Sequence, residues 1–594
     1  MLSIYDYIMI LFYFVFTASL GFVFKKFIKG SNDYFAGGKK MNWWMLGASS
    51  FIANFSAWTF TGAAGIAYQY GAIFLLIYLA DIVGFVFGYL WFAPRFRRLR
   101  LITAMDAVRM RFGRVNEQLY TWLQVVTSYI GGAVWLVGLS IIISAVFHIP
   151  QVPVIVICAV TIMTMALLGG SWAVAASDFI QTLLLMAYSV IIAVLTVKYV
   201  GGVGSFIEKI PDSHMQFIRP IGSVKYDWLY LLTAVIWGVY QKNSIDFGAA
   251  KYIAAKDDNH ARKSALVPLI GYLILPVFWF IPAVAANIIV PDLAEKYASF
   301  NVPGEVSYIA VCIAILPKGM LGLLVAGLFA ATMTSMDTAL NKNAGFLTKN
   351  VYQPVFRKNA SDHELLRAGE VFTVISGFMI MGIAILLATH GKISLFDTYL
   401  YLGAYIQVPL TVAMFMGIMV RRTPAWSAWA TILFGVGVSM FLFEVVPLEF
   451  MKTQLVPLVG EKSYSYMITN KFTLTNLITV PLSSLFFFAT RLFYREHRHN
   501  HEYMESLKEF TCRIKTPVDF ESEVGGDNTA QQARIIGVLA LVYGGFICLA
   551  VLIPNPGYGK LSIASCALVM LCVGTGFIVY SKKVVASSSN LQLE

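Results

Sequence analysis

Two hydrophobic stretches of the sequence are interrupted by polar residues of the kind that bind a cation. One is FIANFSAWTFT at residues 51–61, and the other is AATMTSMDTALN at residues 330–341. Inside a bilayer every polar group must find a partner within the protein, so hydroxyls and freed carbonyls here are available as ligands. Sodium prefers hard oxygens of this type. These residues predict a sodium site between two membrane helices.

The spacing within the second stretch places three ligands on one side of a helix. Ala331, Thr334 and Ser335 lie three and four residues apart, which brings one carbonyl and two hydroxyls to the same face. The other ligands would be the carbonyls of Ile52 and Phe55, freed where the first stretch unwinds. The alternative is that the two hydroxyls bond to carbonyls one turn earlier in their own helix.

Two carboxylates at membrane depth predict a second cation site. A carboxylate in this position costs several kcal/mol unless it is paired or binds a cation. Asp337 and Thr338 follow Thr334 on the same helix. Asp178 lies near the inner end of another span. We expect a second sodium ion among these four residues. The alternatives are that Asp337 pairs with Lys342 or that Asp178 merely caps a helix.

The composition indicates an all-α polytopic membrane protein. Of the 594 residues, 58% are hydrophobic and only 13% are charged, and the mean hydropathy is +0.71. A soluble protein of this length could not bury so much apolar surface. Because a span takes roughly 20 apolar residues, the hydrophobic runs predict about fifteen spans. The third to sixth are residues 73–92, 119–147, 154–168 and 172–197, and the eleventh is residues 395–420.

The net charge of +12 marks topology rather than a nucleic-acid partner. The lysines and arginines cluster after alternate spans, and the intervening loops carry few or none. Under the positive-inside rule this pattern puts the N-terminus outside and the C-terminus inside. We therefore expect a multi-pass protein of the plasma membrane, which in a bacterium is the inner membrane, with lipid as its surroundings.

Two of the predicted spans are interrupted in corresponding places. The second span, residues 44–70, contains Asn54, and the seventh, residues 228–252, contains QKNSID at residues 241–246. Each alone could be a kinked helix whose polar groups are satisfied by neighbours. Interrupted helices at matching positions of two halves are typical of inverted-repeat transporters with a site at the midplane.

These segments resemble the solute:sodium symporter family, which includes sodium/sugar, proline and sialic acid transporters. The resemblance rests on SNDYFAGGKKMNWW (31–44), GASSFIANFS (47–56), ASDFIQ (176–181), KYIAAK (251–256) and FAATMTS (329–335). It runs from about residue 33 to residue 422. It implies a LeuT-type core of two inverted five-helix halves, formed by the second to eleventh predicted spans, with extra flanking helices.

The resemblance also assigns the cations. It implies that the main sodium ion binds the five positions already reached from spacing. It implies a second ion at Asp178, Thr334 and Thr338. Asp337 departs from the serine usual in the family, so the affinity or the proton sensitivity of that site is expected to differ.

For the solute, the resemblance implies a site between the second, third, seventh and eleventh spans. Asn54 and Asn243 match positions that bond to hydroxyls in sugar transporters, and Asp246 replaces an aromatic inner gate. Lys242 would either hold a substrate carboxylate or pair with Asp246, four residues on. The expected substrate-binding residues are Asn54, Trp58, Thr59, Tyr78, Asp81, Trp237, Lys242, Asn243, Asp246 and Tyr401.

The predicted organisation is a transport core at residues 33–422 with flanking segments. These are an extra N-terminal span (1–32), two extra spans (423–493), a cytoplasmic loop (494–532), two C-terminal spans (533–586) and a polar tail (587–594).

The predicted function is sodium-coupled symport, not enzymatic catalysis. The solute would be small and polar, most consistent with a sugar or sugar acid, and would be imported by alternating access in a monomer. The alternatives are uptake of an amino acid or another small carboxylate and, from other classes, an ion channel or a membrane enzyme. Only the symporter would show solute uptake that disappears when sodium is removed.

Overall fold

The computed structural model describes residues 2–25, 39–53, 55–101, 103–218, 225–244, 250–390, 394–495, 501–523 and 525–591. The regular structure in these ranges is helical, apart from one isolated bridge between Met41 and Ala255.

The α-helices of the first part of the chain are α1 (Ile4–Lys25), α3 (Trp43–Ala53), α4 (Gly62–Tyr70), α5 (Leu75–Phe87), α6 (Ala93–Arg98), α7 (Ala104–Phe112), α8 (Arg114–Phe147), α9 (Gln151–Val200), α10 (Val203–Lys209), α11 (Trp228–Lys242), α12 (Ala250–Ile253), α13 (Asp258–Ser264) and α14 (Leu266–Ile289). Those that follow are α15 (Leu293–Lys296), α16 (Ser307–Ile315), α17 (Met320–Phe346), α18 (Asp362–His390), α19 (Leu395–Leu402), α20 (Val408–Met419), α21 (Ser427–Met440), α22 (Glu449–Val459), α23 (Glu461–Thr469), α24 (Lys471–Ala489), α25 (His501–Lys515), α26 (Phe520–Glu523), α27 (Thr529–Leu549) and α28 (Gly557–Leu591).

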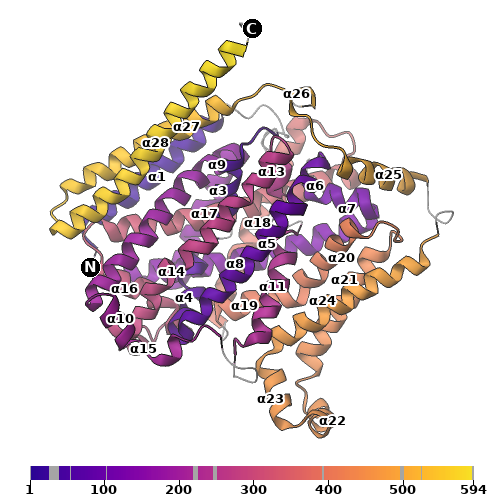
Figure 1. Cartoon of the computed structure of the whole chain (residues 1–594), viewed down its shortest axis with the longest axis horizontal. Helices are drawn as coiled ribbons and strands as arrows, with labels where there is room; N and C mark the ends of the chain where they lie inside the picture. The colour runs from indigo at the N-terminus through magenta and orange to yellow at the C-terminus, as the bar shows by residue number, and fades with distance from the viewer. Residues whose placement is uncertain are drawn as a thin grey trace.

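The helices form a bundle, and the C-terminal end of α28 extends beyond it (Figure 1). Helices α27 and α28 pack on each other along one side, next to α1, and α20, α21 and α24 form the other side. Helix α17 runs through the interior, where it packs against α3, α8 and α9. This placement buries the polar residues of α17 in protein instead of lipid.

Eleven helices in the described ranges are long and apolar enough to cross a membrane, and shorter apolar helices accompany them. The prediction of about fifteen spans is therefore not confirmed as a count. Predicted spans at residues 154–168 and 172–197 fall within one helical element, α9. Because its 50 residues would extend about 75 Å, α9 is longer than one crossing requires.

The second predicted span is broken in the middle. Helix α3 ends at Ala53, and a short 3-10 helix, η2 (Ala57–Phe60), leads through Thr61 into α4. Ser56 caps η2 by accepting a hydrogen bond from the backbone N–H of Trp58. The N–H of Ala57 donates to Oγ1 of Thr332 on α17 at 2.9 Å. The break therefore turns its free backbone groups toward α17.

The predicted cytoplasmic loop carries helix α25, which is docked on the bundle. Its apolar residues Leu507, Phe510 and Ile514 recur at helical spacing and are buried. The helix packs against α6 and α7. An amphipathic helix at this place thus covers the short helices that join the third and fourth predicted spans.

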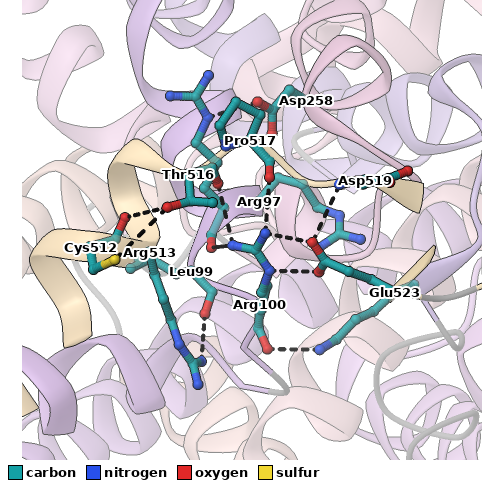
Figure 2. Close-up of polar contacts among 12 residues, drawn as sticks. Arg97, Leu99, Arg100, Asp258, Cys512, Arg513, Thr516, Pro517, Asp519 and Glu523 are labelled. Atoms are coloured by element: carbon teal, nitrogen blue, oxygen red, sulfur yellow. Dashed lines mark hydrogen bonds and ion pairs between the residues drawn. The ribbon is translucent and has the colours of Figure 1, made fainter. Parts of the chain in front are cut away.

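Arg100 joins the end of this segment to the turn after α6 (Figure 2). Its guanidinium donates to both carboxylate oxygens of Glu523, at 2.5 and 2.6 Å, and to the carbonyl of Pro517 at 3.0 Å. Arg513 in turn donates to the carbonyl of Leu99 at 3.1 Å. The hydrogen bond from Arg100 lowers the pKa of Glu523 below its ordinary value.

We expect Glu523→Gln to loosen α25 and α26. The substitution removes a partly exposed ion pair worth up to about 1 kcal/mol, so amide exchange in α25 should be up to about fivefold faster by mass spectrometry. Because the pKa of Glu523 is lowered, the wild-type contact is complete above the ordinary glutamate pKa and is lost as the pH falls through the lowered value. Glu502→Gln, on the exposed face of α25, is the control; equal exchange in both variants would contradict this role.

Candidate cation and solute site

The Ser335 hydroxyl of α17 faces the break after α3. Its Oγ lies 3.2 Å from the carbonyl oxygen of Ala331, 3.4 Å from that of Phe55 and 3.5 Å from that of Ala53. Ser335 is 1% exposed, so these oxygens are screened from water and lipid. One hydroxyl and three carbonyl oxygens thus converge between two helices, a donor set suited to an alkali cation.

The other two residues predicted for the main sodium site are engaged elsewhere in this conformation. The carbonyl of Ile52 accepts a hydrogen bond from the N–H of Phe55 at 2.9 Å. Thr334 Oγ1 donates to Oε1 of Gln181 on α9 at 2.7 Å. Spacing had pointed to neither Ala53 nor Gln181, although both lie in the segments singled out from the sequence. The structure therefore brings together Phe55, Ala331 and Ser335 and adds Ala53.

A second group of oxygens lies between α9 and α17. The Oδ1 atoms of Asp178 and Asp337 and the Oγ1 atom of Thr338 are buried without a hydrogen-bond partner. The carboxylates are 0% and 4% exposed and interact electrostatically with each other. Asp178 lies inside α9, so the alternative that it caps a helix is wrong. Buried, unsatisfied oxygens with this much negative charge fit a bound cation.

A cavity of about 80 Å³ lies beside the break. Its walls come from the break itself, α5, α11, α14 and α19, with aromatic rings predominating. The residues that line it are Ala53, Ser56, Trp58, Phe74, Ile77, Tyr78, Asp81, Trp135, Tyr230, Ala234, Trp237, Gln241, Lys242, Tyr272, Phe396, Tyr399, Leu400 and Phe472. A few polar groups set in apolar walls are typical of small-molecule sites, and the volume is below the usual range, as in a contracted site.

Five of the ten residues predicted to bind the solute line this cavity: Trp58, Tyr78, Asp81, Trp237 and Lys242. Three do not line it: Thr59, Asn243 and Tyr401. The Asn243 amide donates to the carbonyl of Gly84 at 2.9 Å, and Tyr401 packs its ring against Phe443. Asn54 and Asp246 lie outside the described residues.

Sequence reasoning missed the pairing of two polar lining residues. Gln241 Nε2 donates to the hydroxyl of Tyr399 at 3.0 Å, which joins α11 to α19 across the cavity wall. Trp58 packs beside Tyr399 and stacks on Phe396, with ring planes 9° apart in the second pair. The break and α19 thus contribute aromatic rings, and α11 and α19 contribute hydrogen-bonding groups, to the same space.

An ion pair forms one wall of the cavity. Lys242 Nζ lies 3.0 Å from Oδ2 of Asp81, and their side chains are 6% and 17% exposed. The expectations for Lys242 were Asp246 or a substrate carboxylate, but its ion-pair partner in the described structure lies on α5. Glycine makes the contact possible: a Cβ on Gly84 would lie 2.4 Å from the carbonyl oxygen of Gly238. Close approach of α5 and α11 at these glycines brings the two charges together.

Comparison with known proteins finds similar transporters. The model of the sodium:solute symporter family matches residues 34–435. The sodium/glucose cotransporter of Vibrio parahaemolyticus is 27% identical over 461 residues, covering 73% of this chain and 83% of that protein. The sodium/sialic acid symporter SiaT of Proteus mirabilis (strain HI4320) is 24% identical over 422 residues, covering 69% of this chain and 83% of that protein.

Two solved structures share the fold. A Na+-coupled sialic acid symporter in a substrate-bound outward-open state superposes with a TM-score of 0.65 at 20% identity, covering 81% of this chain and 98% of that chain. Mhp1, a nucleobase-cation-symport-1 family transporter in a closed conformation, superposes with a TM-score of 0.51 at 13% identity, covering 80% and 98%. The helical core is thus of the LeuT-like kind.

We expect Lys242→Met to lower the thermal unfolding temperature of the purified protein strongly, because it leaves the Asp81 carboxylate buried without its counter-charge, at a cost of about 3 kcal/mol. Adding Asp81→Asn to Lys242→Met should recover most of the loss. Lys225→Met is the matched control, since Lys225 pairs with Asp397 at 3.8 Å on a more exposed surface. Equal losses in the two single variants would show that burial of the pair is unimportant.

Proposed function

Because this chain belongs to the sodium:solute symporter family, we propose that it is a sodium-coupled symporter that imports a small polar solute by alternating access. Its family and relatives are transporters, so it is not an enzyme. The proposed solute is a sugar or a sugar acid. Sodium is cargo as well as the coupling ion.

The observation that carries the proposal is the meeting of Ser335 with the carbonyl oxygens of Ala53 and Phe55. A cation held there would join the broken span to α17, in addition to the hydrogen bond between Ala57 and Thr332. For the complete site we propose Ile52, Phe55, Ala331, Thr334 and Ser335. Ile52 and Thr334 would exchange their present partners for the ion. Binding would thus favour the conformation in which α3 packs against α17.

The driving force follows from the charge that moves. Each sodium ion that crosses a potential of 100 mV contributes about 2.3 kcal/mol, enough for about fifty-fold accumulation of a neutral solute. A second ion at Asp178, Thr334, Asp337 and Thr338 would double this free energy and so square the accumulation ratio. The unsatisfied buried oxygens of that group support a second cation.

The cavity supports a sugar or sugar acid as the solute. Trp58 and Tyr399 offer ring faces to the apolar face of a sugar, and Gln241 offers an amide to its hydroxyls. The Asp81–Lys242 pair adds an acceptor and a donor without net charge. Relatives with these printed substrates are the sodium/glucose and sodium/sialic acid transporters. For an amino acid or other carboxylate, Lys242 would have to leave Asp81.

The membrane arrangement completes the proposal. The basic clusters favour a plasma-membrane protein with an outer N-terminus and an inner C-terminus. We retain about fifteen crossings, because broken spans such as α3–α4 and the short helix α11 would each count as one. A monomer suffices, since the groups described above come from one chain.

We expect Ser335→Ala to weaken sodium activation of solute uptake at least about tenfold, because a charge-bearing ligand bond is worth about 1.5–3 kcal/mol. The measurement is radiolabelled uptake into proteoliposomes at increasing sodium, with choline replacing sodium. Ser565→Ala, which removes an exposed hydroxyl from α28, should transport like the wild type. Unchanged sodium dependence in Ser335→Ala would remove the site assignment, and uptake in choline would favour a channel.

The solute is to be identified first by thermal shift with sugars, uronates, sialic acid and amino acids, each with and without sodium. A sugar or sugar acid should raise the unfolding temperature more when sodium is present, because the two ligands stabilise the same conformation. Stabilisation by amino acids alone would replace the proposed solute class and leave sodium coupling intact.

A further inference from the structure

One lysine reaches the second group of oxygens from the inner side of the bundle. Lys251 lies on α12, the short helix at the end of the interrupted seventh predicted span. Its Nζ donates to Oγ of Ser49 on α3 at 2.7 Å. The Ser49 hydroxyl in turn donates to Oδ2 of Asp178 on α9. An ammonium group is thus two hydrogen bonds from a carboxylate that the preceding section assigns to a cation.

The neighbouring ammonium groups leave several oxygens of this region without a hydrogen-bond partner. Asp178 and Asp337 bring two carboxylates, and Lys251 interacts electrostatically with Asp178. Lys342 also lies within electrostatic reach of Lys251 and opposes its charge there. Oδ1 of each carboxylate and Oγ1 of Thr338 still accept no hydrogen bond. Lys251 is therefore linked by hydrogen bonds to the Ser49–Asp178 end of the group. Oδ1 of Asp337 and Oγ1 of Thr338, on α17, remain without a hydrogen-bond partner.

We propose that the Lys251 ammonium is a tethered cation that competes with the second sodium ion for Asp178. An ammonium on a flexible four-carbon stem is a compact point charge that can occupy or leave such a position. The inference rests on the proposed function, because it takes sodium to be the competing ion. It adds a specificity-determining residue from outside the predicted site.

The competition links the ion to the inner side of the protein. Helix α12 packs against α3 and α6, and the Lys251–Ser49 hydrogen bond ties it to α3 at the level of the ion. When sodium takes Asp178, charge repulsion displaces the ammonium and this tie is lost. Binding of the second ion therefore weakens a contact that holds the inner half of the broken span, which is the half that must move for release to the inside.

A purely structural role makes a different prediction. If Lys251 only fastened α12 to α3, its removal would destabilise the protein and leave sodium affinity unchanged. If its charge competes with sodium, removal of the charge must tighten sodium binding, and a charged replacement must not. The two roles are thus separated by equilibrium ion binding in the absence of solute, a measurement that does not depend on transport.

The experiment is equilibrium binding of radioactive sodium to the purified full-length chain in lipid nanodiscs. We expect Lys251→Gln to bind the second ion at least about tenfold more tightly than the wild type, because a positive charge a few ångströms away is removed from a weakly screened site. Lys251→Arg should bind like the wild type. In an Asp178→Asn background, Lys251→Gln should bring no gain, since the competition acts through that carboxylate.

Each other result decides against the inference. Unchanged sodium affinity in Lys251→Gln, or the same gain in Lys251→Arg, would overturn it. A gain that persists with Asp178→Asn would also overturn it, as would the same gain in Lys256→Gln, whose lysine contacts Asp527 and Thr529 instead. Retained binding at the main site shows that a variant is folded. Absence of any sodium binding or sodium-driven uptake in the wild type would instead refute the proposed function.

Discussion

The structure depends on a helix that stops inside a low-dielectric region. A break in the backbone leaves N–H and carbonyl groups unpaired, and neither lipid nor bulk water can satisfy them there. One neighbouring helix, α17, supplies polar partners for these groups. Thr332 of α17 receives the N–H of Ala57, and Ser335, one turn along, faces the carbonyls of Ala53 and Phe55. These contacts with α17 stabilise the interrupted helix. They also place the carbonyl oxygens of Ala53 and Phe55 near the Ser335 hydroxyl, where a cation could bind.

From that contact a continuous polar network extends through the interior. Thr334 connects α17 to Gln181 of α9, and one turn earlier on α9 Asp178 connects to Ser49 of α3 and onward to Lys251 of α12. These contacts therefore involve helices from both predicted halves and end at α12, at the end of the second interrupted span. Carboxylates in such a network are costly unless their charges are matched, so movement of any one cation changes the favoured partner of the others. Under the proposed function, this dependence would let ion binding at Asp178 change the contacts of α3 and α12.

Much of the cation region follows from the sequence because it is local. Helical periodicity puts Ala331 and Ser335 on one face, and a run containing Asn54, Ser56 and Thr59 cannot be an ordinary span. The partners across helices do not follow. The ion pair between Lys242 and Asp81 of α5 could not be read from the sequence, since tertiary packing decides which carboxylates a lysine reaches. Asp246, the partner weighed from spacing, lies outside the described residues. Thr59 and Tyr401 are residue types suited to a sugar site but do not line the cavity, and Tyr401 packs against Phe443 instead. The helical fold was predictable from hydropathy, whereas the count of spans was not, since broken and bent helices blur where one crossing ends.

The close approach of α5 and α11 at Gly84 and Gly238 has a mechanical consequence. Backbone lies almost directly on backbone there, with the Asp81–Lys242 bond and the amide of Asn243 fastening the same face. Because few side-chain atoms lie between the two helices at this contact, α5 and α11 have little freedom to slide or rotate against each other. Helices α5 and α11 are therefore expected to move as one rigid unit, so a rearrangement of the cavity would bend the chain at the ends of these two helices.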